Sequence, residues 1–401
     1  MEKATKNTHL NHLEDNIFLN GIEGTRDSIN FIQGLRDTLQ GNNSRAMNTS
    51  VKWDGAPAIW IGPHPTNGHL MVAKKSLFNK VPLYYQSVAD IKNSTDLSKE
   101  LKKKFILAFE MYKDVKLDTL IQGDFLFDQS DLSTQTIDGE KFLVFQPNTI
   151  AYTIPADSDL GRIVLKKKMG IVFHTSYSGS TIPTLSARAG VRLPKAPEGV
   201  WQLDADYEMS TLLTKSDVKK IDDELSNVGR HFRLVSRTTF EVMNEPHIAA
   251  LATTYTNAFI RNNVTPTAED AAVGFPKFIE EKYGREMLKR KTAAGQDRQK
   301  AIMQAALMPV TKIPKHEMVS LFHLYYSLQK AKDIMIKMLS RASFIKTWLK
   351  TYDGWRATGQ EGFVASDKTG TNSVKLVNRL EFSYANFSDD VIKGWQSDFR
   401  R

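Results

Sequence analysis

The sequence predicts an α+β protein in which a mainly β core is interrupted by a large helical insertion. Short β-rich runs fill residues 51–203, and helical periodicity dominates from about residue 207 to residue 350. Strand character returns near Gly362 and Ser373. We therefore divide the 401 residues into a first part of the core (1–205), a helical insertion (206–350) and the final core strands (351–401).

The N-terminal part is expected to begin with a helix over residues 27–40. Its apolar residues recur at helical spacing on one face, and Gly41 supplies a stop: Ile29, Ile32, Leu35 and Leu39. Strands are then expected at residues 58–61, 142–145, 163–165 and 170–173, separated by turn signals such as Gly62-Pro63 and Asn67-Gly68. A helix over residues 98–112 interrupts these strands.

The insertion is expected to contain several helices. One begins at Ser216-Asp217, another at residues 265–269, and a long one follows Pro314 and ends near Trp348. The last strands are expected at residues 362–364 and 373–377. The aromatic residues Phe322 and Tyr325, with Tyr326 beside them, fit core packing better than base stacking because apolar residues accompany them at helical spacing.

Composition narrows the class of protein. Hydrophobic residues make up 41% and charged residues 25%, which is ordinary for a globular domain. No apolar run reaches the roughly 18 residues of a membrane span, and the first residues lack the apolar stretch of a signal peptide. Cysteine is absent, so we expect neither disulfides nor thiolate chemistry, and we expect an intracellular, cytoplasmic location.

The net charge of +9 favours polyanionic partners. Basic residues gather at 102–104, at 166–168 and between residues 282 and 300. Each of these runs alone is more typical of a solvated face, but together they predict a nucleic-acid partner. Membrane association is not expected. The sequence does not indicate whether the protein is a monomer or an oligomer.

The sharpest local feature is residues 51–57, which read VKWDGAP. Lys52 follows β-type sequence and precedes Asp54-Gly55, a turn-forming pair that lets the backbone approach a ligand. A lysine amine is nucleophilic only when neutral, so we expect nearby cations, metal ions or burial to lower the pKa of Lys52. Alone, such a tetrapeptide is more typical of a surface hairpin turn.

Four further segments give this lysine possible partners. Lys74 and Lys75 offer cations, and Asp124 lies inside an otherwise apolar strand, where a carboxylate needs a partner. Glu361 precedes an apolar strand, and Lys375 lies within another. Each has a structural interpretation as well, such as an edge carboxylate or a lysine whose stem covers apolar surface.

In this order the segments resemble the nucleotidyltransferase motifs of ATP-dependent DNA and RNA ligases and mRNA capping enzymes. The residues 52–55 (KWDG), 123–126 (GDFL), 361–364 (EGFV) and 373–377 (SVKLV) carry the resemblance. It implies a mainly antiparallel β nucleotidyltransferase core, similar to ATP-grasp folds, that uses ATP and Mg²⁺ (or Mn²⁺). Along its length the chain also resembles an uncharacterised family encoded by tailed bacteriophages, which would place it in the host cytoplasm.

The resemblance implies a role for each matching residue. Lys52 would become adenylylated, and Glu361 and Asp124 would hold the metal. Nucleotide binding would involve the following residues, with Lys74 as the alternative to Lys75 and Phe145 and Phe173 as alternative stacking aromatics: Asp54, Gly55, Lys74, Lys75, Asp124, Phe145, Phe173, Glu361 and Lys375.

Three departures from the motifs direct the choice of function. Asp124 stands where glutamate is usual, and Val377 stands where a second lysine is common. About 25 residues follow Lys375, which is too few for the C-terminal OB domain of DNA ligases and capping enzymes. We therefore expect an RNA-ligase-like enzyme acting on RNA or DNA ends or nicks. One alternative is a catalytically inactive relative that binds nucleic acid or serves in phage assembly. Another is a nucleotidyl-transferring enzyme that acts on a protein or a small molecule.

Competing sites have weaker signals. His9 and His12, near Glu14, could bring two imidazoles together but are more typical of surface histidines. His316-Glu317 lacks the second histidine of a zinc protease motif, and no Walker-type loop is present.

Overall fold

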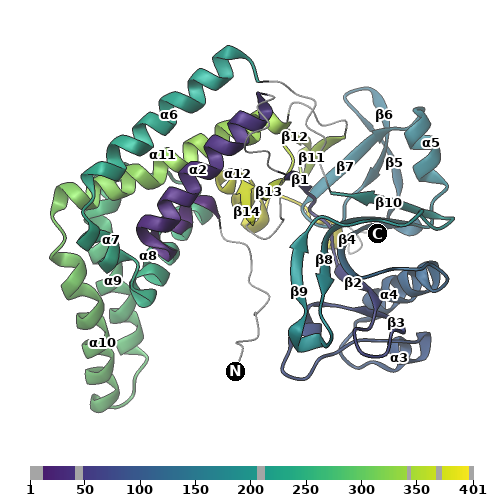
Figure 1. Cartoon of the computed structure of the whole chain (residues 1–401), viewed down its shortest axis with the longest axis horizontal. Helices are drawn as coiled ribbons and strands as arrows, with labels where there is room; N and C mark the ends of the chain where they lie inside the picture. The colour runs from purple at the N-terminus through teal and green to yellow at the C-terminus, as the bar shows by residue number, and fades with distance from the viewer. Residues whose placement is uncertain (1–11, 41–47, 206–212, 341–344, 367–372, 397–401) are drawn as a thin grey trace.

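A computed structural model of the chain describes residues 12–40, 48–205, 213–340, 345–366 and 373–396. The protein is α+β, as predicted, with the helices of residues 21–39 and 215–339 on one side and the two larger sheets, together with the helices of residues 88–112 and 159–165, on the other (Figure 1). None of the described helices is long and apolar enough to span a membrane. His9, one of the two histidines considered above, lies outside the described residues.

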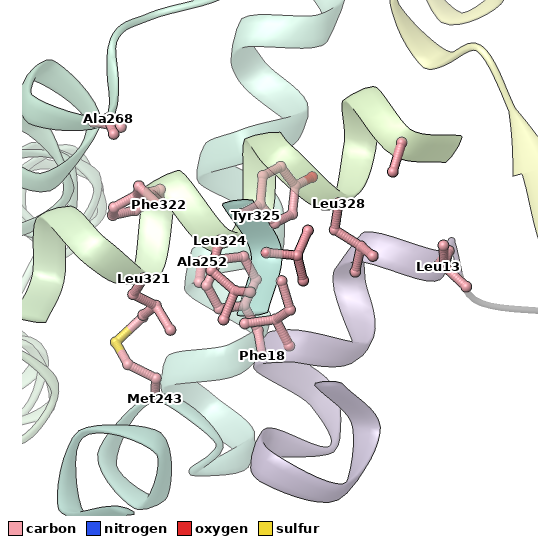
Figure 2. Packing of buried hydrophobic residues seen from close by; sticks show 14 of the residues in the cluster. Leu13, Phe18, Met243, Ala252, Ala268, Leu321, Phe322, Leu324, Tyr325 and Leu328 are labelled. Carbon is pink, nitrogen blue, oxygen red and sulfur yellow. The ribbon is translucent and has the colours of Figure 1, made fainter. Parts of the chain in front are cut away.

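The helical part combines the middle of the chain with its N-terminal segment. Six helices form its main body: α6 (Lys215–Leu234), α7 (Arg237–Met243), α8 (Pro246–Arg261), α9 (Ala268–Leu288), α10 (Ala293–Thr311) and α11 (Lys315–Leu339). They share one hydrophobic core with α1 (Asn16–Leu19) and α2 (Gly21–Leu39). Figure 2 shows Phe18 of α1 among residues of α11, including Phe322 and Tyr325. Phe322 and Tyr325 are buried and Tyr326 is half-buried against the same core, as expected for core packing.

Two sheets form the β part. One has the order β10-β8-β4-β2-β3, with β9 beside β8, and the other has the order β12-β11-β7-β6-β5. Their bounds are β2 (Ala58–Pro63), β3 (Leu70–Ala73), β4 (Leu120–Asp128), β5 (Ser133–Ile137), β6 (Glu140–Phe145), β7 (Ile150–Pro155), β8 (Met169–Ser178), β9 (Ser186–Ala189), β10 (Val200–Asp204), β11 (Lys346–Thr351) and β12 (Gly354–Thr358). The pairing is antiparallel except between β10 and β8, so a mainly antiparallel architecture is confirmed. Helices α3 (Val88–Asn93), α4 (Lys99–Tyr112) and α5 (Asp159–Leu165) belong to this part.

A third sheet lies between the two parts. It has the order β1 (Asn48–Lys52), β13 (Gly362–Ser366) and β14 (Ser373–Val377), and helix α12 (Arg379–Phe387) follows it. Phe363, Ala365 and Leu376 pack into the core of the helical part, whereas Val377 packs into the core between the two larger sheets. This small sheet therefore contributes side chains to both hydrophobic cores.

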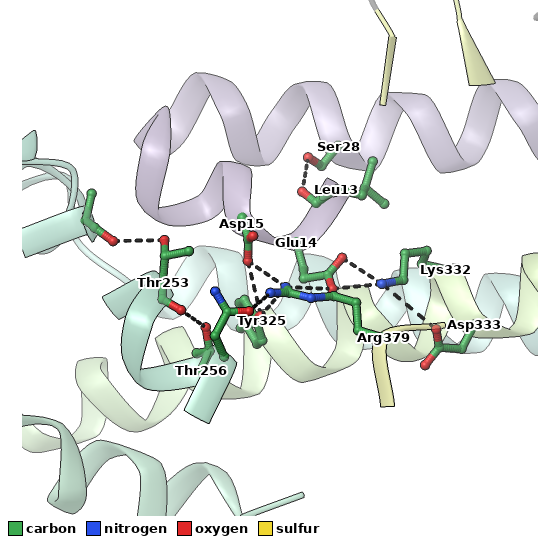
Figure 3. Close-up of polar contacts among 12 residues, drawn as sticks. Leu13, Glu14, Asp15, Ser28, Thr253, Thr256, Tyr325, Lys332, Asp333 and Arg379 are labelled. Atoms are coloured by element: carbon green, nitrogen blue, oxygen red, sulfur yellow. Dashed lines mark hydrogen bonds and ion pairs between the residues drawn. The ribbon is translucent and has the colours of Figure 1, made fainter. Parts of the chain in front are cut away.

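A buried ionic network joins the N-terminal segment to α11 and to the start of α12 (Figure 3). Lys332 Nζ lies 2.7 Å from Glu14 Oε1, and both side chains are fully buried. Arg379 Nη1 lies 2.8 Å from Asp15 Oδ1 and 3.3 Å from Glu14 Oε1, and it donates to the Tyr325 hydroxyl at 3.0 Å. Asp333 Oδ1 also lies 4.0 Å from Lys332 Nζ, so three acids, Glu14, Asp15 and Asp333, face the two bases of the network.

Most expected elements are confirmed, but two are corrected. Residues 163–165 were expected to form a strand and belong instead to α5, whose N-cap Ser158 accepts a hydrogen bond from Gly161 N. This local capping favours a helix over a strand. The long helix after Pro314 ends at Leu339, and Trp348 lies in β11, which pairs with β7. The strand thus begins inside the range 206–350 assigned to helices.

Candidate active site around Lys52

Strand pairing brings Lys52 and Glu361 together. Lys52 is the last residue of β1 and faces Gly362 in the register with β13, so Glu361 is adjacent to it. The Lys52 Nζ and Glu361 Oε2 atoms form an ion pair. The side chains are 26% and 14% exposed, respectively. The amine predicted to be reactive is thus mostly buried and in direct contact with a carboxylate from the other end of the chain.

Asp54 fixes the turn after Lys52. Its carboxylate accepts hydrogen bonds from Asn148 Nδ2 at 2.8 Å, Thr149 N at 2.7 Å and Ile150 N at 2.8 Å. Its own backbone N–H donates to the Tyr152 hydroxyl at 2.6 Å. The sequence assigned Asp54 to nucleotide binding, but these three donors tie its carboxylate to the start of β7. We therefore regard Asp54 as a positioning residue.

Gly55 allows the turn to lie directly against Asp124. A Cβ atom at Gly55 would lie 2.5 Å from the Asp124 Cβ and 3.1 Å from the Phe125 carbonyl oxygen, closer than side chains approach in proteins. Backbone hydrogen bonds from Ala56 N to Phe125 O (2.9 Å) and from Phe125 N to Pro57 O (3.0 Å) hold the two segments together. Glycine is required here for close approach rather than for an unusual φ angle.

Asp124 is a largely buried carboxylate, 21% exposed, and among the described residues its closest ionisable neighbour is His174. It lies in β4, and its Oδ2 atom is 3.6 Å from His174 Nε2 in β8. Burial raises the pKa of Asp124 to about 7; the Lys52 charge opposes this rise and Asp54 adds to it. Burial, with a smaller contribution from Lys52, lowers the pKa of His174 to about 4, so that this imidazole is neutral at pH 7.

His174 is the residue that sequence analysis missed. The sequence drew attention to residues 171–173 as an apolar run and stopped one residue before it. Successive side chains of a strand point to opposite faces. The available signal was therefore a polar residue following an apolar one, Phe173, at the end of an expected strand; the pairing of this strand with β4 beside Asp124 is seen only in the structure.

Lys375 completes the cationic side of the site. It lies in β14 opposite Val364 of β13. Burial lowers the pKa of Lys375; Lys52 and the more distant Lys75 lower it further, whereas Glu361 raises it. The charges of Lys52, Glu361 and Lys75 thus all act on Lys375.

The two candidate lysines after β3 have different surroundings. Lys74 Nζ lies 3.0 Å from Asp96 Oδ2 and donates to the Asp96 carbonyl at 2.6 Å, so this lysine is held on the side of Asp96. Lys75, at the start of the 3-10 helix Lys75–Phe78, is exposed and acts electrostatically on Lys375. Of the two alternatives, the structure favours Lys75.

The two expected stacking aromatics are core residues. Phe145 is 1% exposed and packs against Phe127, Tyr152 and Trp201. Phe173 is fully buried, with its ring 5.9 Å from that of Tyr112. Both rings already have protein neighbours and no free face for a base. The expectation that either one stacks on a nucleobase is therefore corrected, because each strand directs its aromatic side chain into a hydrophobic cluster.

The charge state of Lys52 differs from the expectation. Burial lowers the pKa of Lys52, but the ion pair with Glu361 and the charges of Asp124 and Asp54 raise it, and the raising effects prevail. For Glu361, burial raises the pKa more than Lys52 lowers it. Lys52 is therefore protonated at neutral pH in the ligand-free protein, and the expectation of a lowered pKa was wrong for this state.

The site offers two carboxylates for a divalent cation. Among the described residues, no group of three histidine, cysteine, aspartate or glutamate side chains is arranged to hold a metal. Mg²⁺ keeps several waters and needs only one or two carboxylates, so Asp124 and Glu361 would suffice. The raised pKa of Asp124 reflects a buried charge that is poorly compensated, and a cation would supply the compensation. The residues present therefore fit such an ion.

Fold and site together define an α+β protein whose central small sheet presents a lysine–carboxylate centre beside two further lysines. The chain belongs to a protein family described as a family of unknown function, DUF6267, whose model matches residues 7–390. No curated protein matches the chain, and no solved structure matches it.

Proposed function

We propose that this protein is an ATP-dependent polynucleotide ligase, with RNA as the preferred substrate, that acts through a lysyl-adenylate at Lys52. One observation carries the proposal: the largely buried Lys52 amine forms an ion pair with Glu361, from the other end of the chain, and is subject to the charge of Asp124. The preference for RNA comes from the resemblance of the motifs to those of RNA ligases.

In the first step, Lys52 Nζ attacks the α-phosphorus of ATP. An N–P bond forms, the bond from the α-phosphorus to the bridging oxygen breaks, and pyrophosphate leaves with that oxygen. The Lys52 ammonium must lose two protons: Glu361, which is in contact with Nζ and has a raised pKa, is suited to accept one, and the other passes to solvent. Lys375 and Lys75 would face the phosphate oxygens and stabilise their charge.

A divalent cation held by Asp124 and Glu361 would neutralise phosphate charge and weaken the hold of these carboxylates on the Lys52 proton. In the second step, a 5′-phosphate oxygen of the nucleic acid attacks the adenylyl phosphorus and Lys52 is released. In the third step, a 3′-hydroxyl attacks the activated 5′-phosphate, the new phosphodiester forms and AMP departs. Lys52, Asp54 and Gly55 provide the fixed geometry for the first two steps.

A second candidate is a catalytically inactive relative that retains the fold and binds nucleic acid. Two observations favour it. Lys52 is protonated in the ligand-free protein. Val377, at the place of a common second lysine, is 5% exposed and packs in the hydrophobic core.

Covalent labelling separates the two candidates. Incubation with α-labelled ATP and Mg²⁺ should attach label to the wild-type protein, and Lys52→Arg should abolish it because a guanidinium keeps the positive charge but is not nucleophilic. Lys74→Ala serves as the matched control and should retain the label, since that lysine pairs with Asp96. Absence of label from folded protein with ATP, GTP and NAD, or label that survives Lys52→Arg, would reject the proposal.

A further inference from the structure

The outer end of the helical part is a basic helical hairpin. Helices α9 and α10 pack against each other, and in Figure 1 the α10 helix lies on the far side of the molecule from the sheets. The inner half of the hairpin is held by buried residues, including Phe275, Ile279 and Val310. Between residues 288 and 300, only Gln299 is buried. The tip therefore contributes little to the core and is available to solvent.

The tip concentrates positive charge. Residues 282–300 contain seven basic and two acidic side chains, a net charge of +5 in a chain whose total is +9. The basic residues are Lys282, Arg285, Lys289, Arg290, Lys291, Arg298 and Lys300. On α9 the first three are spaced by three and four residues and therefore share one face of the helix.

These charges are weakly compensated. Lys289 Nζ lies 2.8 Å from Glu286 Oε1, and Arg285 lies 3.9 Å from Glu281, but both pairs are exposed and such pairs contribute little. Within the part of the chain that the structure describes, no carboxylate forms an ion pair with Arg290, Lys291, Arg298 or Lys300. A hydrogen bond from Lys289 lowers the pKa of Glu286, and Arg290 and Lys282 also lower it, so several cations surround one acid.

We propose that the tip of the α9–α10 hairpin binds the phosphate backbone of a nucleic-acid duplex. The inference rests on the proposed ligase function for its biological substrate, and it assigns duplex binding to a surface separate from the Lys52 site. Lysine and arginine that contact phosphates release counterions, which makes affinity depend on the number of cations rather than on base sequence. Seven cations on one exposed hairpin match such a backbone.

A nucleic acid fits this surface better than an anionic membrane. Helices that lie on membranes need a broad apolar face. Residues 293–301 of α10 read AAGQDRQKA and include no bulky apolar side chain. Among the described residues 282–300, Leu288, at 86% exposed, is the one large apolar side chain that faces solvent.

The test compares two triple variants with equal loss of charge. The first is Arg290→Ala, Lys291→Ala and Arg298→Ala at the tip. The control is Lys166→Ala, Lys167→Ala and Lys168→Ala in the β part. Binding of each protein to a short, fluorescently labelled, nicked duplex is measured by anisotropy without ATP, between 50 and 200 mM salt.

The tip variant should bind more weakly and with a smaller salt dependence. Each lost phosphate contact reduces the slope of log affinity against log salt by about 0.9, so three contacts reduce it by about 2.7. Between 50 and 200 mM salt, the wild-type affinity should therefore fall about 40-fold more than that of the tip variant. The control variant should keep the wild-type slope.

Two results would overturn the inference. One is an equal change in both triple variants, which would reflect net charge rather than the tip. The other is unchanged duplex binding in the tip variant together with loss of its binding to phosphatidylserine vesicles. Because binding is measured without ATP, it is independent of the Lys52 chemistry. If ATP labels the wild type but the tip variant binds the duplex normally, only the duplex-binding inference fails. If no label forms but the tip variant loses duplex binding, only the ligase proposal fails.

Discussion

Removing Lys332 tests the buried ionic network most directly. The Lys332→Met substitution keeps the apolar stem and deletes the charge opposite Glu14, while both side chains are fully buried in the wild type. Burial raises the pKa of Glu14, but the Lys332 and Arg379 charges outweigh it and lower the pKa from 4.5 to about 2. A shift of that size corresponds to about 3 kcal/mol. Breaking a buried pair usually costs about 3–5 kcal/mol, so both routes give the same range.

The dependence on pH has a definite sign. In the wild type, a lowered pKa means that the ionised Glu14 stabilises the fold above pH 4.5 and that this contribution disappears as the pH falls towards 2. In Lys332→Met, Glu14 loses its closest cation, so its ionisation opposes folding. The difference in free energy of unfolding between the two proteins should therefore be largest near pH 7 and smaller near pH 4.

Equilibrium unfolding in urea, followed by tryptophan fluorescence, measures this difference. The double variant Glu14→Gln with Lys332→Met should recover most of the stability lost in the single variant, because it leaves no uncompensated charge. A loss below about 1 kcal/mol in the single variant, or an equal loss at both pH values, would refute the reasoning.

Two further predictions concern the site. Gly55→Ala should destabilise the protein by about 1–3 kcal/mol and reduce ATP labelling, because its Cβ would overlap Asp124. The control is Gly284→Ala in α9, whose Cβ would meet no atom within 4 Å. This variant should be neutral or more stable than the wild type by up to about 1 kcal/mol. Equal urea midpoints for Gly55→Ala and Gly284→Ala would contradict the packing argument. The pKa of the Asp124 carboxyl is raised to about 7 in the folded protein, compared with about 3.8 in the unfolded chain. Between these two pH values the folded protein keeps the carboxyl protonated, whereas the unfolded chain has released the proton. Stability from this group is therefore lost as the pH rises from 4 to 8, and Asp124→Asn should be more stable relative to wild type at pH 8 than at pH 4; the opposite trend in urea unfolding would exclude the assignment.

The sequence predicted much of the fold because the relevant signals are local. Alternating apolar residues around Glu361 and Lys375 indicated strands, and β13 and β14 are where they were expected. A serine before residues 99–112 indicated a helix start, and Ser98 caps α4. The errors came where two local patterns compete, as at residues 163–165, where a short apolar run lies within a capped helix.

The sequence predicted which residues belong to the site better than it predicted their contacts and pKa values. Each motif residue could be recognised from its neighbours, but the position of Glu361 against Lys52 depends on the pairing of β1 with β13, which are far apart in the chain. The pKa of Lys52 depends on the balance between burial and three carboxylates, and no local pattern records that balance. His174 was missed for the same reason, because its proximity to Asp124 comes from the register between β4 and β8.

The small sheet of β1, β13 and β14 has a consequence for dissecting the protein into fragments. Phe363, Ala365 and Leu376 are covered by helices, while Lys52 and Lys375 lie on the same three strands. A fragment lacking residues 206–345 would expose that apolar face to water and leave Glu14 without Lys332. The helices therefore cannot be removed as an independent accessory module, and proteolytic separation of the helical part from the β part should destabilise both.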